Sequence, residues 1–269
     1  MGTATRHIGL DLGGTNIKWA VVDGAGDQWH TLDQGQVPTD TSRGEHSVVP
    51  QLAELATQVR DGAGGPVDSL GVAVPGLYVP ETGVVVFLTN VPGDWSATPV
   101  GVPLSEATGL PTALINGARA FGLAELRFGA GRDVHAFIGF TLGTGIGGVI
   151  AIGNQVVLGF RGRAGELGHQ TIDPDGPWCG CGNRGCVEAY CRADQVAIAC
   201  GAKDPREAIE KASAGDERAV AGWAQIGRYL GIGISNATTV LTPELVILGG
   251  GWSQAADLIL FKCHYQKWR

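Results

Sequence analysis

The chain has 269 residues, 44% of them hydrophobic and 17% charged, a composition that supports a buried core and excludes intrinsic disorder. Its net charge of −7 is spread along the chain, which argues against a nucleic-acid-binding surface because phosphate binding needs a basic face. No apolar run approaches the roughly 20 residues needed to cross a membrane, and none precedes Arg6 as a secretion signal would, so we expect a cytoplasmic protein without membrane contact.

The first half of the chain predicts strands separated by glycine-rich turns. Residues 7–23 read as two strands around a Gly-Gly turn, and residues 48–60 as a helix with Leu52, Leu55, Ala56 and Val59 on one face. A buried strand at 69–76, a loop at 87–95 and a strand at 112–115 follow. That last strand stops at Asn116, and an apolar-periodic helix is expected directly after it.

The second half begins with a similar unit at 135–153, again strand, Gly-Thr-rich turn and strand. The repetition indicates a duplicated lobe with a cleft between the copies; the alternative is that glycine-rich hairpins are common in α/β proteins. Helices are predicted at 204–215 and 216–240, and a strand at 244–251. The second helix has Asp216 as N-cap and an apolar stripe made of Val220, Trp223, Ala224, Ile226, Leu230 and Ile234.

Two glycine-rich turns have the composition of phosphate-binding loops. In "DLGGTN" (11–16) glycines let backbone N–H groups approach phosphate oxygens, Thr15 adds a hydroxyl donor and Asp11 can hold a phosphate-bound Mg²⁺. "LGTGIGG" (142–148) has the same capability, although either turn alone is also compatible with a plain hairpin. "LGGG" (248–251), at the end of a strand, can accept a nucleobase or ribose against bare backbone.

A block of cysteines predicts a structural zinc site. Within "GELGHQTIDPDGPWCGCGNRGCVE" (165–188), four side chains have the ligand types and number for tetrahedral Zn²⁺, namely His169, Cys179, Cys181 and Cys186. Four protein ligands close the coordination sphere, so the metal would pin the loop that carries Glu166 and Glu188 and would not activate water. The other three cysteines are expected to be ordinary thiols, namely Cys191, Cys200 and Cys263.

The chain resembles the ROK family (repressors, open reading frames and kinases), especially its bacterial glucokinase branch. The resemblance covers nearly the whole chain and is carried by motifs in family order: "DLGGTN", "GVAVPG", "TLGTGIGG", the "ELGH…CxCGxxGCxE" block and "LVILGGG". The resemblance implies an α/β fold of two actin-like (ribonuclease H-like) lobes. We place the N-terminal lobe at 1–115 and the C-terminal lobe, with the second phosphate turn, zinc loop and adenosine turn, at 116–269. We expect a truncated or altered end, because "FKCHYQKWR" does not continue an amphipathic helix.

The resemblance also implies ATP and Mg²⁺ as cofactors, with transfer of the γ-phosphoryl group to the 6-hydroxyl of glucose or a related hexose or aminohexose. Sugar contacts are implied for Gly76, Asn90, Asn116, Glu166, His169 and Glu188. Contacts with ATP or Mg²⁺ are implied for Asp11, Gly13, Gly14, Thr15, Asn16, Lys18, Thr144, Gly145, Gly249 and Gly250. Members of the family are commonly homodimers or homotetramers.

One position departs from the family pattern. In the kinases an aspartate directly after the strand-end asparagine takes the proton of the sugar hydroxyl, and here that position is Gly117. General-base catalysis typically contributes ~10² to 10⁴ in rate, roughly 3–5 kcal/mol of barrier. The sequence therefore predicts a hexose kinase whose turnover is impaired while sugar binding survives.

Two other functions stay open from the sequence. A non-catalytic sugar sensor acting through a protein partner is favoured by Gly117, and a zinc-stabilised structural protein is disfavoured by the phosphate turns. A DNA-binding repressor is disfavoured because only ten residues precede Asp11, too few for a helix-turn-helix.

Overall fold

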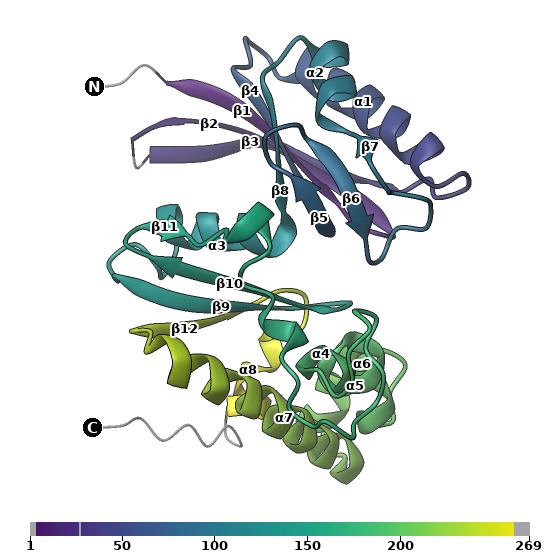
Figure 1. The fold of residues 1–269 in the computed structure, drawn as a ribbon, viewed down its shortest axis with the longest axis vertical. Coiled ribbons are helices and arrows are strands. Elements are labelled where there is room, and N and C mark those ends of the chain that lie inside the picture. Colours follow the sequence, from purple (N-terminus) through teal and green to yellow (C-terminus); the bar gives the residue numbers. More distant parts are fainter. Residues whose placement is uncertain (1–3, 27, 261–269) are drawn as a thin grey trace. The chain divides into compact units, whose positions relative to one another are not determined.

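The computed structural model describes residues 4–26 and 28–260 and divides into two compact units (Figure 1). The first contains the chain up to Ala120 together with Leu158–Arg163, and the second contains Phe121–Val157 and the chain from Ala164 onward. No helix in the described part of the chain is long and apolar enough to cross a membrane.

The first unit is built on a five-stranded sheet of order β3-β2-β1-β4-β8. Its strands are β1 (Thr5–Leu12), β2 (Asn16–Ala25), β3 (Gln28–Pro38), β4 (Ser69–Val74) and β8 (Thr112–Asn116). The first three form antiparallel pairs, whereas β4 is parallel to both β1 and β8. A separate three-stranded sheet comprises β5 (Gly76–Val79), β6 (Val84–Leu88) and β7 (Thr98–Pro99).

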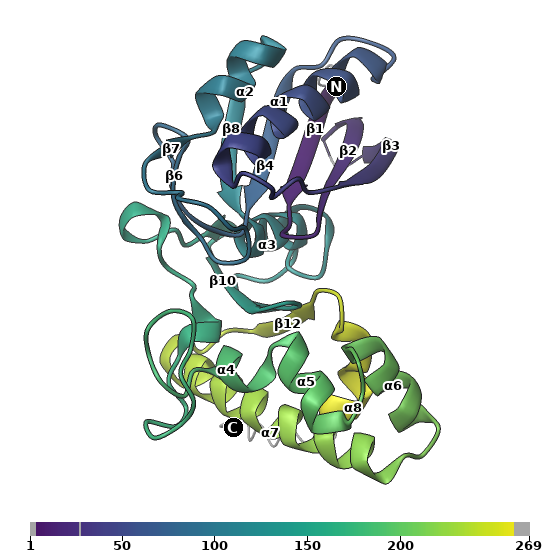
Figure 2. The same cartoon turned by 90° about the vertical axis from the view of Figure 1, so that its right-hand side faces the viewer.

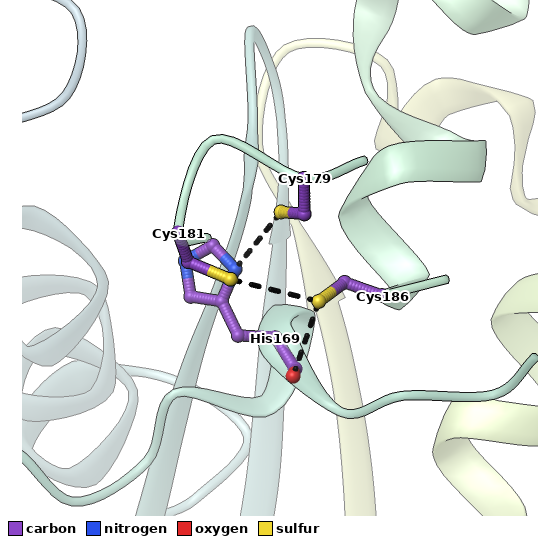
Figure 3. A group of neighbouring side chains, drawn as sticks. All are labelled: His169, Cys179, Cys181 and Cys186. Carbon is purple, nitrogen blue, oxygen red and sulfur yellow. Dashed lines mark hydrogen bonds between the residues drawn. The ribbon is translucent and has the colours of Figure 1, made fainter. Parts of the chain in front are cut away.

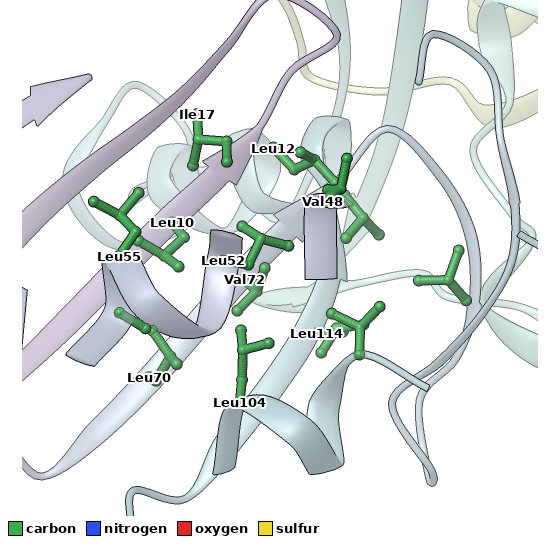
Figure 4. Packing of buried hydrophobic residues seen from close by; sticks show 14 of the residues in the cluster. Leu10, Leu12, Ile17, Val48, Leu52, Leu55, Leu70, Val72, Leu104 and Leu114 are labelled. Carbon is green, nitrogen blue, oxygen red and sulfur yellow. The ribbon is translucent and has the colours of Figure 1, made fainter. Parts of the chain in front are cut away.

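Helices α1 (Glu45–Gly62) and α2 (Gly101–Thr108) pack against each other and on one face of the five-stranded sheet (Figure 1). Alternate residues of β1, Ile8, Leu10 and Leu12, are buried, as the two-residue period of a strand requires. They meet the apolar face of α1, including Leu52 and Leu55 (Figure 4). At ~1.5–3 kcal/mol for each fully buried aliphatic side chain, this cluster fixes the position of the loops at the strand ends.

The second unit is built on a four-stranded sheet of order β11-β10-β9-β12. Its strands are β9 (Ala136–Leu142), β10 (Ile146–Ile152), β11 (Gln155–Val156) and β12 (Leu245–Gly249), with β12 parallel to β9. Strand β9 is buried on both faces, because Ile138, Phe140 and Leu142 join the cluster of α7 whereas Phe137 packs with Leu126 of α3. Helices α3 (Gly117–Phe128) and α7 (Glu217–Leu241) thus cover opposite faces of this sheet.

Further helices surround α7 in the second unit. Figure 2 shows α4 (Val187–Cys191), α5 (Ala193–Cys200), α6 (Pro205–Ser213) and α8 (Ala256–Leu260) beside it. Of the single-turn 3₁₀ helices, η2 (Leu167–His169) and η3 (Ser253–Ala255) belong to this unit, whereas η1 (Phe160–Gly162) belongs to the first. Asp216 caps α7 as predicted, since its carboxylate accepts from the Ala219 N–H at 2.8 Å.

Most predicted elements are confirmed, and the errors concern the ends of strands and one position on α7. Residues 87 and 88, expected in a loop, end strand β6, because they pair with Leu77 and Gly76 of β5. The predicted strand at 69–76 ends at Val74, and Gly76 begins β5. Val220 is 45% exposed, because the buried stripe of α7 runs instead through Ala219, one helical turn before Trp223.

Cys191 and Cys200 are buried, free thiols as expected. Burial raises the pKa of the Cys191 thiol, which therefore stays protonated and unreactive. Cys263 and the "FKCHYQKWR" tail lie outside the described residues.

Candidate active site

In the first unit, the predicted site residues gather where parallel strands end. Asp11 of β1 is level with Ala73 of β4, which is level with Ile115 of β8. The segments that follow these residues therefore leave the same edge of the sheet. This carboxyl-terminal edge is where α/β proteins place their ligands.

The first glycine turn connects β1 and β2 and is tightly packed. A Cβ at Gly13 would lie 2.8 Å from the Asn16 carbonyl oxygen, and one at Gly14 would lie 2.1 Å from that of Asn90. Both positions therefore exclude side chains. The turn also brings Asn90, which follows β6, beside the Gly14 backbone within the same unit.

Thr39, which sequence reasoning missed, holds this turn from outside. Its hydroxyl donates to the Gly13 carbonyl at 2.7 Å, and its N–H donates to the Thr15 carbonyl at 2.9 Å. In a trans peptide the N–H points opposite to the carbonyl, so the Gly14 N–H faces away from Thr39. That orientation suits an anion at the turn.

Asp11 is exposed at the end of β1 and is opposite Lys18 of β2 in the antiparallel register. Partial burial of its carboxyl raises the pKa of Asp11, and the nearby Lys18 charge opposes that shift. A carboxylate is the kind of oxygen ligand that a phosphate-bound Mg²⁺ takes from a protein.

Asn116 ends β8 and caps the following helix. Its side-chain oxygen accepts from the Ala118 N–H at 2.9 Å, and its amide nitrogen donates to the Gly76 carbonyl at 3.1 Å. Asn116 therefore joins the start of β5 to the start of α3. Both predicted sugar-site positions in this contact, Gly76 and Asn116, belong to the first unit.

Gly117 is the first residue of α3, and nothing about its position requires glycine. Its φ is outside the left-handed region, and within the described chain a Cβ there would meet no heavy atom within 4 Å. Two residues on, Arg119 is buried at 1% exposure, a charged core residue that apolar periodicity did not indicate. Burial raises the pKa of Tyr78, and the Arg119 charge opposes that shift.

In the second unit, the second glycine turn connects β9 and β10 beside the end of β12. Gly249 is level with Thr141 of β9 in the parallel register. Gly250 has φ +99°, and a Cβ there would lie 2.5 Å from the Leu142 carbonyl oxygen. The predicted phosphate turn and the predicted adenosine turn are thus in direct backbone contact, with Thr144 exposed at the tip.

Glu188, in the first turn of α4, packs its carboxylate against the second glycine turn. Its Oε2 accepts from the Ile146 N–H at 2.8 Å, and its Oε1 lies 3.8 Å from the Cys179 sulfur and 4.0 Å from His169 Nδ1. A Cβ at Gly145 would meet Oε2 of this carboxylate, so a larger residue there would displace the Glu188 side chain. Glu188 therefore connects the turn to the cysteine loop.

Four side chains converge in that loop, His169, Cys179, Cys181 and Cys186 (Figure 3), with all ligand atoms within 4.8 Å of one another. His169 Nδ1 lies 3.5 Å from the Cys179 sulfur, and the sulfurs of Cys181 and Cys186 are 3.6 Å apart. Zn–S bonds of ~2.3 Å in a tetrahedron place sulfurs about 3.8 Å apart, so the donor set fits Zn²⁺.

The local backbone explains why these ligands meet. The Gly182 N–H donates to the Cys179 carbonyl at 3.0 Å, which closes a turn around Cys181. Gly185, with φ +59°, packs on the Asp173 carbonyl, where no side chain fits. Burial raises the pKa of the Cys179 and Cys186 thiols, so that forming their thiolates carries a cost that a bound metal ion would offset.

His169 presents its other nitrogen, Nε2, to Glu166, whose carboxylate oxygen lies 3.9 Å away. Glu166 precedes η2 and is half-buried. Three predicted sugar-site residues of the second unit thus lie together: His169 belongs to the cluster, and Glu166 and Glu188 lie at its two ring nitrogens.

A match to the ROK family spans residues 7–267. The chain belongs to the ROK family. The chain is 33% identical to a glucokinase of Thermotoga maritima over 94% of its own length and 84% of the relative's. Among solved structures it is similar to a ROK family glucokinase from Streptomyces griseus in complex with glucose and AMPPNP, with TM-score 0.83, 30% identity, and 99% and 92% of the two chains covered.

The ROK family also includes regulators with this architecture. The chain is similar to a ROK family transcriptional regulator, a homologue of the Escherichia coli MLC protein, with TM-score 0.84 and 27% identity. The likeness covers 96% of this chain and 68% of that one. The α/β actin-like fold of the ROK family is thereby established, and the His/Cys cluster is consistent with the zinc motif of the family.

Proposed function

We propose that this protein is an ATP-dependent hexose kinase scaffold whose reaction is transfer of the γ-phosphoryl group to the 6-hydroxyl of glucose or a related hexose or aminohexose. The supporting observation is that a ROK family chain, similar to glucokinases over nearly its whole length, keeps both glycine turns, with no room for a side chain at Gly13 and Gly14 in the first and at Gly148 in the second. Phosphoryl transfer depends mainly on positioning and charge neutralisation, which such turns supply.

The proposal gives each group of residues a role. Asp11 would hold Mg²⁺, which neutralises charge on the transferred phosphoryl group when bound. The residues that would contact phosphate and adenosine are Gly13, Gly14, Thr15, Asn16, Lys18, Thr144, Gly145, Gly249 and Gly250. The residues that would bind the sugar hydroxyls are Gly76, Asn90, Asn116, Glu166, His169 and Glu188.

His169, Cys179, Cys181 and Cys186 would hold a structural Zn²⁺, whose contribution is to fix the loop. We expect about one Zn²⁺ per purified chain. The protein is expected to be a homodimer or homotetramer and to act in the cytoplasm. Protein that is folded and metal-free would refute the zinc assignment.

Turnover is expected to be impaired because the position of the proton-accepting aspartate is Gly117. The carboxylates of Glu188 and Glu166 are engaged around the cysteine loop and are poor substitutes. Glycine at 117 is not demanded by the backbone conformation, and the position has room for the Cβ of a replacement residue.

The test is a coupled assay with ATP and a panel of hexoses on the native protein, Gly117→Asp and Gly117→Asn. Aspartate should raise kcat by ~10² to 10⁴, whereas asparagine, of the same size but without basicity, should not. Native turnover at the ~1–100 s⁻¹ usual for kinases would show that Gly117 does not impair the reaction.

A second function, non-catalytic sugar sensing through a protein partner, is favoured by Gly117 and by the likeness to a ROK transcriptional regulator. It predicts that glucose binds both the native protein and Gly117→Asp by calorimetry while neither turns over. If Gly117→Asp turns over, sugar sensing is excluded as the original function of this site.

A further inference from the structure

Trp252, directly after the "LGGG" turn, holds the second glycine turn by its carbonyl groups. Its indole Nε1–H donates to the Gly143 carbonyl at 3.1 Å, and its backbone N–H donates to the Leu142 carbonyl at 3.2 Å. The Ala193 N–H, at the start of α5, donates to the same Gly143 carbonyl at 3.2 Å. Both lone pairs of that carbonyl are therefore engaged from the interior of the second unit.

This arrangement decides which way the next N–H points. The Gly143 carbonyl and the Thr144 N–H belong to one trans peptide, so they point in opposite directions. With the carbonyl held toward Trp252 and Ala193, the Thr144 N–H is directed away from the interior, at the exposed tip of the turn. An oriented backbone N–H of this kind is a phosphate ligand.

The same side chain also links the two glycine turns of the second unit. Trp252 follows Gly250, whose Cα packs so closely on Leu142 that a Cβ would lie 2.6 Å from the Leu142 nitrogen. The indole is 2% exposed and adds a hydrogen bond to the backbone contact already made at Gly250. A shift of one turn relative to the other would break the Trp252 contact.

We propose that Trp252 is a positioning residue for nucleotide: its indole N–H orients the Thr144 amide toward the phosphates of Mg·ATP and fixes the phosphate turn against the Gly249–Gly250 turn. This inference rests on the proposed function. It concerns nucleotide affinity and not the sugar.

Trp223 of α7 provides a matched control in the same core. It is fully buried, its ring centroid lies 5.7 Å from that of Trp252, and its Nε1 has no hydrogen-bond partner in the described part of the chain. Trp223→Phe and Trp252→Phe therefore remove the same atoms from one cluster, but only the second removes a bond to the turn.

The experiment is calorimetric titration of the full chain with AMPPNP in the presence of Mg²⁺, and separately with glucose. Relative to the native protein, Trp252→Phe should bind AMPPNP about 3- to 10-fold more weakly, the loss expected for one hydrogen bond, with glucose affinity unchanged. Trp223→Phe should leave both affinities within twofold. A benzothienyl-alanine residue at 252, in which sulfur replaces the N–H at nearly the same volume, should reproduce the AMPPNP loss even if Trp252→Phe folds poorly.

The outcomes separate this inference from the proposed function. A native protein that binds no AMPPNP refutes the proposed function and the positioning role with it. Native binding with undiminished affinity in both position-252 variants overturns the positioning role alone. If the benzothienyl variant loses AMPPNP and glucose affinity in parallel, the positioning role is also overturned, because such a loss indicates general destabilisation of the protein.

Discussion

Glu188 Oε2 accepts a hydrogen bond from the Ile146 N–H at 2.8 Å, so a side chain on α4 completes the hydrogen bonding of the second glycine turn. Replacement by alanine leaves that N–H without its acceptor in a partly buried position. We expect Glu188→Ala to lower the free energy of unfolding by about 1–3 kcal/mol. Glu188→Gln keeps a carbonyl acceptor of the same reach and should recover most of that loss in urea denaturation. Equal stability of the two variants would contradict the role of the contact.

Metal removal should destabilise the loop that carries Cys179, Cys181 and Cys186. These thiols are close enough to share one ion, and without it their partial burial is uncompensated. Dialysis against a strong zinc chelator should therefore lower Tm, and added Zn²⁺ should restore it.

Two cysteine variants distinguish the cluster from ordinary core thiols. Cys186→Ala should lose bound zinc by elemental analysis. Cys191→Ala, which removes a thiol equally buried but outside the cluster, should keep it. Retention of zinc by Cys186→Ala would exclude this cluster as the metal site.

Replacement of Asp11 by asparagine should leave stability unchanged or raised but should weaken nucleotide binding. Partial burial raises the pKa of its carboxyl above the ordinary aspartate value, so the folded protein holds this proton more tightly than the unfolded chain. The group therefore favours folding at low pH, and that contribution is lost as pH rises through the folded-state pKa. Asp11→Asn should accordingly have a Tm at pH 7 equal to or above that of the native protein.

The same variant should lose the Mg²⁺-dependent part of its AMPPNP affinity in titrations with and without Mg²⁺. The native Tm should approach that of Asp11→Asn as pH falls below the ordinary carboxyl range. A lower Tm for Asp11→Asn at pH 7 would show that the carboxylate stabilises the fold, contrary to the direction of its pKa shift.

Gly117→Ala should stabilise the protein. Helix α3 begins at this residue with Asn116 as its cap, its φ suits any residue, and a methyl group there meets open space. Removal of glycine freedom from the unfolded chain should add ~0.4–1 kcal/mol to the free energy of unfolding. Gly117→Asp should gain a further ~0.3–1 kcal/mol at low salt from the helix dipole, a difference that high salt should reduce. Thermal unfolding of both variants checks this, and destabilisation by alanine would refute it.

The elements of the fold were predictable because their signals are local. Apolar alternation in β1, helical spacing in α1 and the carboxylate cap of α7 are each contained in a few consecutive residues. The metal cluster was predictable because ligand chemistry is recognisable even when one ligand, His169, is ten residues from the next.

The residues that hold the glycine turns from outside had no local sequence signal. Thr39 and Trp252 act on carbonyl groups 26 and 109 residues away, through contacts that the tertiary fold creates. Neither the threonine nor the tryptophan is set apart by periodicity or motif. Arg119 was missed for a related reason, since its burial depends on packing and not on residue type.

Strand β9, packed on both faces, limits mutational tolerance far beyond the residues that would touch a ligand. Gly139 lies in its middle, and a Cβ there would come within 2.8 Å of Val149 and 3.1 Å of Phe121. Even alanine would have to displace the strand or its neighbours. Because β9 runs directly into the Leu142–Ile146 turn, such a displacement would be transmitted to the turn, and we expect substitutions at Gly139 to behave in mutational scans as if they were in the site.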